Sequence, residues 1–136
     1  MRLLSSPFSF RGEGYLGKIY RPYLVIEITS KKIKEWIPLE VLVDTGADYT
    51  LLPKKYAGLL GINIEKECRA ENTYGIGGRE KIYLCKNKVV VKIGSFTKTV
   101  PVGFLSRDDV QALLGRLQAL EVLTLIMKQC ITTFEA

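Results

Sequence analysis

The chain has 136 residues, of which 47% are hydrophobic and 25% are charged, as expected of one soluble domain with its own core. Lysine and arginine exceed aspartate and glutamate by 20 to 14, so the net charge is +6, and histidine is absent. The lack of histidine excludes catalytic Ser–His and Cys–His pairs, and also a metalloprotease helix that binds zinc through two histidines. If the chain hydrolyses peptides, carboxylates are the expected means.

The apolar segments and the cysteines indicate which cellular compartment and which cofactors to expect. No segment approaches the roughly 20 apolar residues that span a bilayer, and the first residues lack the apolar run of a signal peptide. We therefore expect a cytoplasmic protein without membrane contact. Cys68, Cys85 and Cys130 are widely spaced and odd in number, so we expect no disulfide framework, no metal site and no cofactor.

Two groups of lysines raise the question of a nucleic-acid partner. They are Lys31, Lys32 and Lys34, and Lys86, Lys88 and Lys92. Such groups can attract nucleic acid or another acidic partner, or they can lie on solvated strand edges, where lysine blocks unwanted pairing. No aromatic-rich basic motif accompanies them, so we favour the second interpretation and do not expect nucleic acid as a partner.

The first half of the chain predicts strands and one short helix. Residues 1–19 are expected to be irregular, and a single domain is expected over residues 20–136. Alternating apolar residues predict a strand over residues 20–29, and a second strand over residues 35–44 is apolar on both faces near its end, which indicates a central position. Pro53 is suited to start a short helix, and Gly61 is placed to end it.

The second half predicts further strands. Ile62 and Ile64 are expected to start one of them. Residues 70–74 and 79–84 flank a group of glycines and predict the two arms of a hairpin. After an alternating segment that includes Val89, a two-residue turn leads into a returning strand over residues 96–105.

The most informative segment is the one around Asp44. An apolar strand runs directly into this carboxylate, and Thr45 and Gly46 follow it. Glycine allows the backbone to turn tightly, and the hydroxyl can fix local geometry. A carboxylate that is held rigidly and half desolvated at a strand end is suited to proton transfer.

Several motifs carry a resemblance to one family. The segment Asp44-Thr45-Gly46-Ala47-Asp48 resembles the active-site motif of the retropepsin-like aspartic proteases, which include the retroviral proteases. Tyr74-Gly75-Ile76-Gly77-Gly78 is similar to the glycine-rich tip of their flap. Leu113-Leu114-Gly115-Arg116 is similar to the motif after their last core strand. The resemblance implies a mainly β fold, a closed barrel of the acid-protease type with one or two short helices, in a homodimer.

The resemblance also settles how we interpret the end of the chain. Leu113, Leu117, Leu120 and Met127 fit a helical stripe, but Gly115 inside one long helix would cost about 1 kcal/mol. We therefore follow the family and expect a strand at Leu113-Leu114 and a helix that starts around Gly115. Residues 129–134 are expected to form the closing strand, which in the family interleaves with that of the partner chain.

A single Asp-Thr-Gly motif implies two chains. Hydrolysis by carboxylates needs two of them around one water, sharing one proton, as in aspartic proteases. The chain has no second copy of the motif, and Asp48 lies four residues further on and would point elsewhere. We therefore expect a homodimeric aspartic endopeptidase in which each chain donates Asp44 to act on peptides or proteins, with Thr45 and Gly46 completing the catalytic motif.

The same resemblance assigns the remaining site residues. Ala47, Asp48 and Tyr49 would border the substrate, and Gly75, Ile76, Gly77 and Gly78 would cover it from the flap. Arg116 would brace Asp48, since a planar guanidinium can hold a carboxylate at two points. The alternative is a non-catalytic peptide-binding or assembly dimer on the same fold. The intact Asp44-Thr45-Gly46 favours the enzyme.

Overall fold

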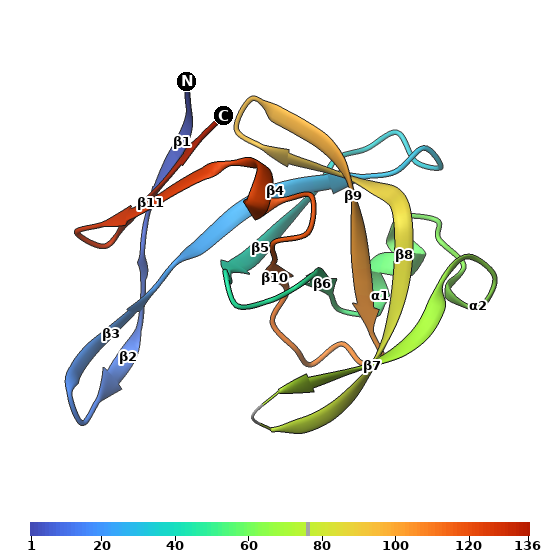
Figure 1. Ribbon diagram of the computed structural model, residues 1–136, viewed down its shortest axis with the longest axis horizontal. Coiled ribbons are helices and arrows are strands. Elements are labelled where there is room, and N and C mark those ends of the chain that lie inside the picture. Colours follow the sequence, from blue (N-terminus) through green and yellow to red (C-terminus); the bar gives the residue numbers. More distant parts are fainter. Residues whose placement is uncertain (76) are drawn as a thin grey trace.

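The computed structural model describes residues 1–75 and 77–136, and its chain is mainly β with two short α-helices, as the sequence predicts (Figure 1). In chain order the elements are β1 (Arg2–Pro7), β2 (Ser9–Gly14), β3 (Gly17–Arg21), β4 (Tyr23–Thr29), β5 (Ile37–Val43), β6 (Thr50–Leu52), α1 (Lys55–Leu59), α2 (Ile64–Glu67), β7 (Arg69–Gly75), β8 (Gly78–Ile93), β9 (Phe96–Leu105), β10 (Leu113–Leu114), the 3-10 turn η1 (Leu120–Val122), β11 (Thr124–Lys128) and β12 (Ile131–Glu135). None of the helices in the described part of the chain is long and apolar enough to cross a membrane.

The body of the molecule is a seven-stranded mixed sheet with the order β4-β5-β10-β6-β9-β8-β7. Strand β4 also pairs with β8, so the sheet curls back on itself. Strand β5 lies between β4 and β10 and is therefore central, as predicted from its apolar faces. The short strand β10 runs parallel to β5 and antiparallel to β6, and in this way it joins the two halves of the sheet.

The core lies inside this curled sheet. Leu24, Ile26 and Ile28 alternate along β4 and are all buried, as their spacing predicts. Phe104 on β9 and Leu60 after α1 are also fully buried, and they close the core from the other side. Helix α1 ends at Leu59, and Gly61 just after its C-cap has a φ of +73°, a conformation that favours glycine.

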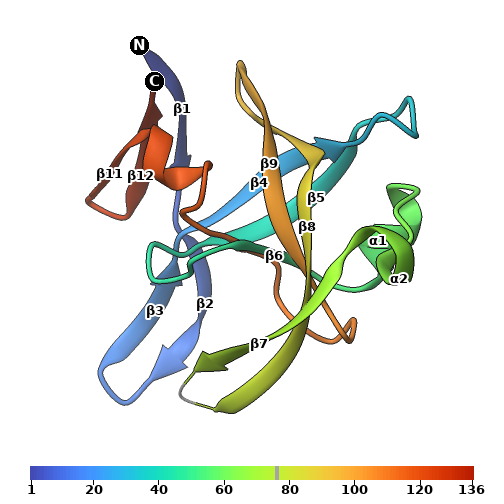
Figure 2. The same ribbon diagram turned by 45° about the vertical axis from the view of Figure 1, so that its right-hand side comes forward.

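The expectation that residues 1–19 are irregular is wrong. They form β1, β2 and most of β3. Strand β1 pairs with β12, so the two termini lie side by side (Figures 1 and 2). Gly12 and Gly17 have positive φ; Gly12 lies at the bulge of the β2–β3 hairpin and Gly17 follows its turn. The partner of β1 lies more than 120 residues away, so no local pattern reveals this strand.

The predicted role of the closing strand also needs correction. Strand β12 is the middle strand of a sheet with the order β1-β12-β11. Both of its edges are thus paired inside the same chain, and no edge remains for the closing strand of a second chain. The free edges of this sheet belong to β1 and β11.

Two predictions of local structure are wrong, each for its own reason. Ile64 starts helix α2 rather than a strand, because the Asn63 side chain accepts a hydrogen bond from the Lys66 N–H at 3.2 Å and caps the helix. The helix expected from Gly115 is replaced by turns and η1, with φ of +55° at Gln118. Residues 124–128 form strand β11, which pairs with β12.

Candidate active site

Asp44 is held at the carboxyl end of β5 by backbone hydrogen bonds. Its N–H donates to the carbonyl of Leu114 on the parallel strand β10 at 3.0 Å. The preceding N–H, that of Val43, donates to the carbonyl of Pro22 at 2.9 Å. Because Val41 and Val43 are buried, the strand cannot shift along its neighbours. Asp44 itself is half-buried, which matches the environment expected for a carboxylate that transfers protons.

The turn after β5 orients the carboxylate. The Gly46 N–H donates to Oδ1 of Asp44 at 2.9 Å, and the Ala47 N–H donates to its backbone carbonyl at 3.2 Å. A Cβ on residue 46 would lie 3.3 Å from that same Oδ1, so a larger residue would crowd the carboxylate. Thr45 is exposed and does not line the cleft described below.

The turn is locked to the segment after β10. The Gly115 N–H donates to Oγ1 of the buried Thr50 at 3.1 Å. The Arg116 N–H donates to the Ala47 carbonyl at 3.0 Å, and the Leu117 N–H donates to the Asp48 carbonyl at 2.9 Å. In the sequence, Thr50-Leu51-Leu52-Pro53 continues the motif, but no role could be assigned to Thr50 from the sequence.

The structure brings Arg116 and Asp48 together, as the resemblance implied. Nη2 of Arg116 forms an ion pair with Oδ1 of Asp48, and its Nε donates to the Ala47 carbonyl at 3.4 Å. The side chains are 47% and 70% exposed, so the pair itself adds at most about 1 kcal/mol to stability. Its main effect is to fix where the loop after Asp44 lies.

A cleft of about 450 Å³ lies between this loop and the β7–β8 hairpin. The site residues predicted from the sequence that line it are Asp44, Gly46, Ala47, Asp48, Tyr49, Gly77 and Gly78. Gly75 pairs with Gly78 at the end of the hairpin, whereas Ile76 lies outside the described residues. The hairpin thus stands opposite Asp44 across the cleft.

Charged residues on the cleft wall were not foreseen. Arg79, Glu80 and Arg107 line it, and Nε of Arg107 lies 3.0 Å from Oε1 of Glu80. Residue 80 belongs to β8 and residue 107 follows β9, so their contact depends on the pairing of two strands. No motif in the sequence links them.

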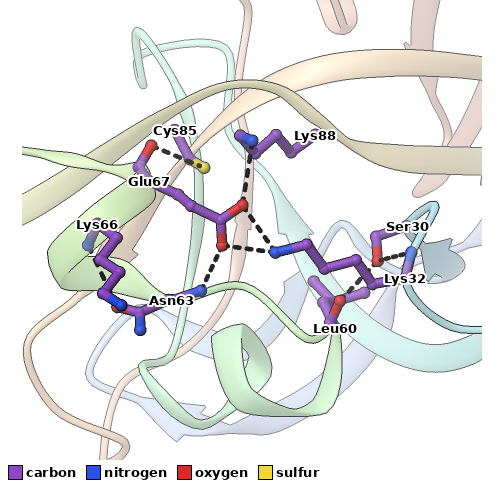
Figure 3. A network of polar contacts seen from close by, with 8 residues as sticks. All are labelled: Ser30, Lys32, Leu60, Asn63, Lys66, Glu67, Cys85 and Lys88. Carbon is purple, nitrogen blue, oxygen red and sulfur yellow. Dashed lines mark hydrogen bonds and ion pairs between the residues drawn. The ribbon is translucent and has the colours of Figure 1, made fainter.

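A network of charged side chains lies away from this cleft, around Glu67 (Figure 3). Its carboxylate accepts hydrogen bonds from Lys32 Nζ at 2.8 and 2.9 Å, from the Asn63 N–H at 2.6 Å and from Lys88 Nζ at 3.1 Å. These contacts, with Lys32 first, lower the pKa of Glu67 from 4.5 to about 2, and Glu67 in turn raises the pKa of Lys88.

Burial, and then the neighbouring Cys85, raise the pKa of the Cys68 thiol from 9.0 to about 12, so it is a poor nucleophile. Over residues 1–75 and 77–136, no three His, Cys, Asp or Glu side chains gather as metal ligands.

The curled β-sheet, the carboxylate at a strand end and the opposing glycine hairpin define a site of the aspartic-protease class. A family model described as "gag-polyprotein putative aspartyl protease" matches residues 31–120. The chain therefore belongs to the retropepsin-like aspartic protease family. The match includes Asp44, the hairpin and Arg116, and it leaves out residues 1–30 and 121–136. A search of curated proteins found no match.

Proposed function

We propose that this chain is an aspartic endopeptidase that acts as a homodimer, with one Asp44 from each chain in the catalytic pair. The observation that carries the proposal is the position of Asp44, which is fixed at the end of β5 and lines the cleft opposite the β7–β8 hairpin. Residues 20–136 would form the catalytic domain as a closed barrel, and a cytoplasmic location remains a prediction.

The reaction needs both carboxylates. One, ionised, takes a proton from the bound water, whose oxygen attacks the peptide carbonyl carbon. The other, protonated, donates its proton to the carbonyl oxygen. As the tetrahedral intermediate collapses and the C–N bond breaks, the leaving nitrogen takes the proton from the first carboxyl. A hydroxyl of the intermediate returns its proton to the second carboxylate, so the pair again shares one proton. A single chain holds only one such carboxylate, so the proposal requires a second chain.

The cleft suits an extended peptide with apolar side chains. Tyr49, Leu51, Tyr74 and Leu113 supply apolar surface along it. The hairpin tip at Gly77 and Gly78 leaves backbone groups accessible to a peptide, which could add to it as a strand. Closure of the hairpin over the substrate would exclude water from the reacting centre. Ala47 and Asp48 would contact the peptide from the opposite wall, with Arg116 holding Asp48 in place.

The first prediction concerns Asp44→Asn. Asparagine has nearly the same shape and can still accept the Gly46 N–H, so the fold and the dimer should persist. Because an amide cannot take a proton from water, we expect peptide cleavage to fall by at least about 1,000-fold. The measurement is cleavage of a mixed peptide library, with and without a statine-type inhibitor, at several pH values.

Asp48→Asn is the matched control, since it changes the same chemical group four residues away. It should retain much more activity than Asp44→Asn. After subunit exchange, an equimolar mixture of wild type and Asp44→Asn should show about half the activity per wild-type chain, because mixed dimers lack one carboxylate. Undiminished activity per wild-type chain, or cleavage by Asp44→Asn near the wild-type rate, would contradict the shared pair.

A further inference from the structure

The β2–β3 hairpin, residues 9–21, extends away from the body of the molecule (Figures 1 and 2). We call it the arm. Tyr15 and Leu16 at its tip are fully exposed, at 102% and 97%. Phe10 and Tyr20 pair edge to face further along the arm, with ring centroids 5.6 Å apart, and both remain about half exposed. So much apolar surface on one projecting element marks an interaction site.

The arm is anchored at its base. Nη2 of Arg11 lies 2.8 Å from Oε1 of Glu40 on β5, and the Arg11 guanidinium stacks 3.6 Å above the Tyr23 ring. The chain leaving the arm pairs at once with β5, since Tyr23 lies opposite Leu42. These contacts hold the arm in a defined direction, which reduces the entropy lost when it meets a partner.

The base of the arm is hydrogen-bonded to the end of β5 that carries Asp44. The Pro22 carbonyl accepts the N–H of Val43, the residue immediately before Asp44. The arm and the β7–β8 hairpin extend from the same side of the body in both views (Figures 1 and 2). Anything that approaches the Asp44 end of β5 from that side therefore meets the arm as well.

We propose that the arm docks against a second copy of this chain, with Tyr15 and Leu16 packing on the partner. The inference rests on the proposed function, because the active site has one carboxylate and is incomplete without a second copy at the Asp44 end. That requirement brings a partner chain to the surface from which the arm emerges. The arm then adds apolar contact to that interface. A second copy of the chain is thus the partner that the active site requires for its second carboxylate.

The test is the double variant Tyr15→Ser/Leu16→Ser, compared with wild type by analytical ultracentrifugation over a range of concentrations. Both side chains are fully exposed, so the variant should fold, which circular dichroism and the thermal midpoint verify. We expect the dimer dissociation constant to rise by at least about tenfold. Activity should fall at low protein concentration and recover at high concentration. The control is Leu59→Ser/Val122→Ser, which removes two apolar side chains that are about half exposed, on α1 and η1.

The outcomes distinguish a failure of the proposed role of the arm from a failure of the proposed catalytic function. If the arm variant dimerises with the wild-type dissociation constant, while Asp44→Asn abolishes cleavage, the role of the arm is overturned and the protease proposal stands. A wild-type chain that stays monomeric at every concentration would overturn both. Cosedimentation of wild type, but not of the arm variant, with lipid vesicles at an unchanged oligomeric state would identify a membrane surface as the occupant and refute docking to a second copy.

Discussion

At the scale of single residues, Gly115 shows how little room the catalytic loops leave. A Cβ at this position would lie 2.2 Å from the Tyr49 carbonyl oxygen and 2.9 Å from the Thr50 nitrogen, both backbone atoms. The two segments approach so closely because the Gly115 N–H reaches the Thr50 hydroxyl and the Arg116 N–H reaches Ala47. The orientation of Asp44 thus depends on a glycine 71 residues further along the chain.

Gly115→Ala should therefore separate the two loops. We expect a loss of about 3 kcal/mol in the free energy of unfolding, together with most of the activity. Gly58→Ala is the matched control: its Cβ would meet no atom within 4 Å, and it lies inside α1, where alanine gains up to about 1 kcal/mol. Urea unfolding of both variants measures the difference. Equal stability of the two would show that the loops can move apart at little cost.

At the scale of elements, Glu67 joins three parts of the fold (Figure 3). It lies at the end of α2, and it holds Lys32 from the β4–β5 connection and Lys88 from β8. Its side chain is 15% exposed, whereas both lysines are about half exposed. The network fixes α2 next to β8, and β8 continues into the hairpin opposite Asp44.

The lowered pKa of Glu67 makes part of the stability dependent on pH. A carboxylate whose folded pKa is about 2 and whose ordinary value is 4.5 stabilises the fold above pH 4.5, and this contribution is lost as the pH falls towards 2. Glu67→Gln should lower the thermal midpoint at neutral pH, and its difference from wild type should shrink across that window. Glu71→Gln, which removes only an exposed pair with Arg69, is the control and should change the midpoint little. A constant difference down to pH 2 would exclude this role of Glu67.

At the scale of the whole molecule, the β1-β12-β11 sheet joins the two ends of the chain. Phe134 on β12 is fully buried and lies opposite Leu4 on β1 and Leu125 on β11. The closing strand is therefore part of the fold of each chain. If the protein is a homodimer, the free edges of β1 and β11 and the arm remain available to the partner.

Phe134→Ala should accordingly destabilise the chain itself. We expect a loss of about 3–5 kcal/mol in the free energy of unfolding, independent of protein concentration. Ile131→Ala on the same strand, where the side chain is 43% exposed, should cost about 1 kcal/mol or less. Chemical denaturation at several protein concentrations measures both. A loss for Phe134→Ala that disappears at high concentration would place the residue in the dimer contact instead.

The sequence by itself determined the features that depend on near neighbours. Alternation along β4 and the apolar end of β5 predicted two strands and the position of Asp44, and the glycines after Tyr74 predicted the hairpin. The break of α1 at Gly61 followed from the left-handed conformation that glycine adopts easily. Such features need only a few adjacent residues, so the linear pattern contains them.

The tertiary structure decided everything that depends on distant pairs. The irregular N-terminus of the sequence became β1 because β12 lies beside it, and the helix expected after Gly115 gave way because residues 124–128 pair with β12. The contacts of Thr50 with Gly115 and of Glu80 with Arg107 form for the same reason. Closing a long loop costs entropy that only a specific partner offsets. Because that partner lies far along the chain, the local sequence pattern does not reveal it.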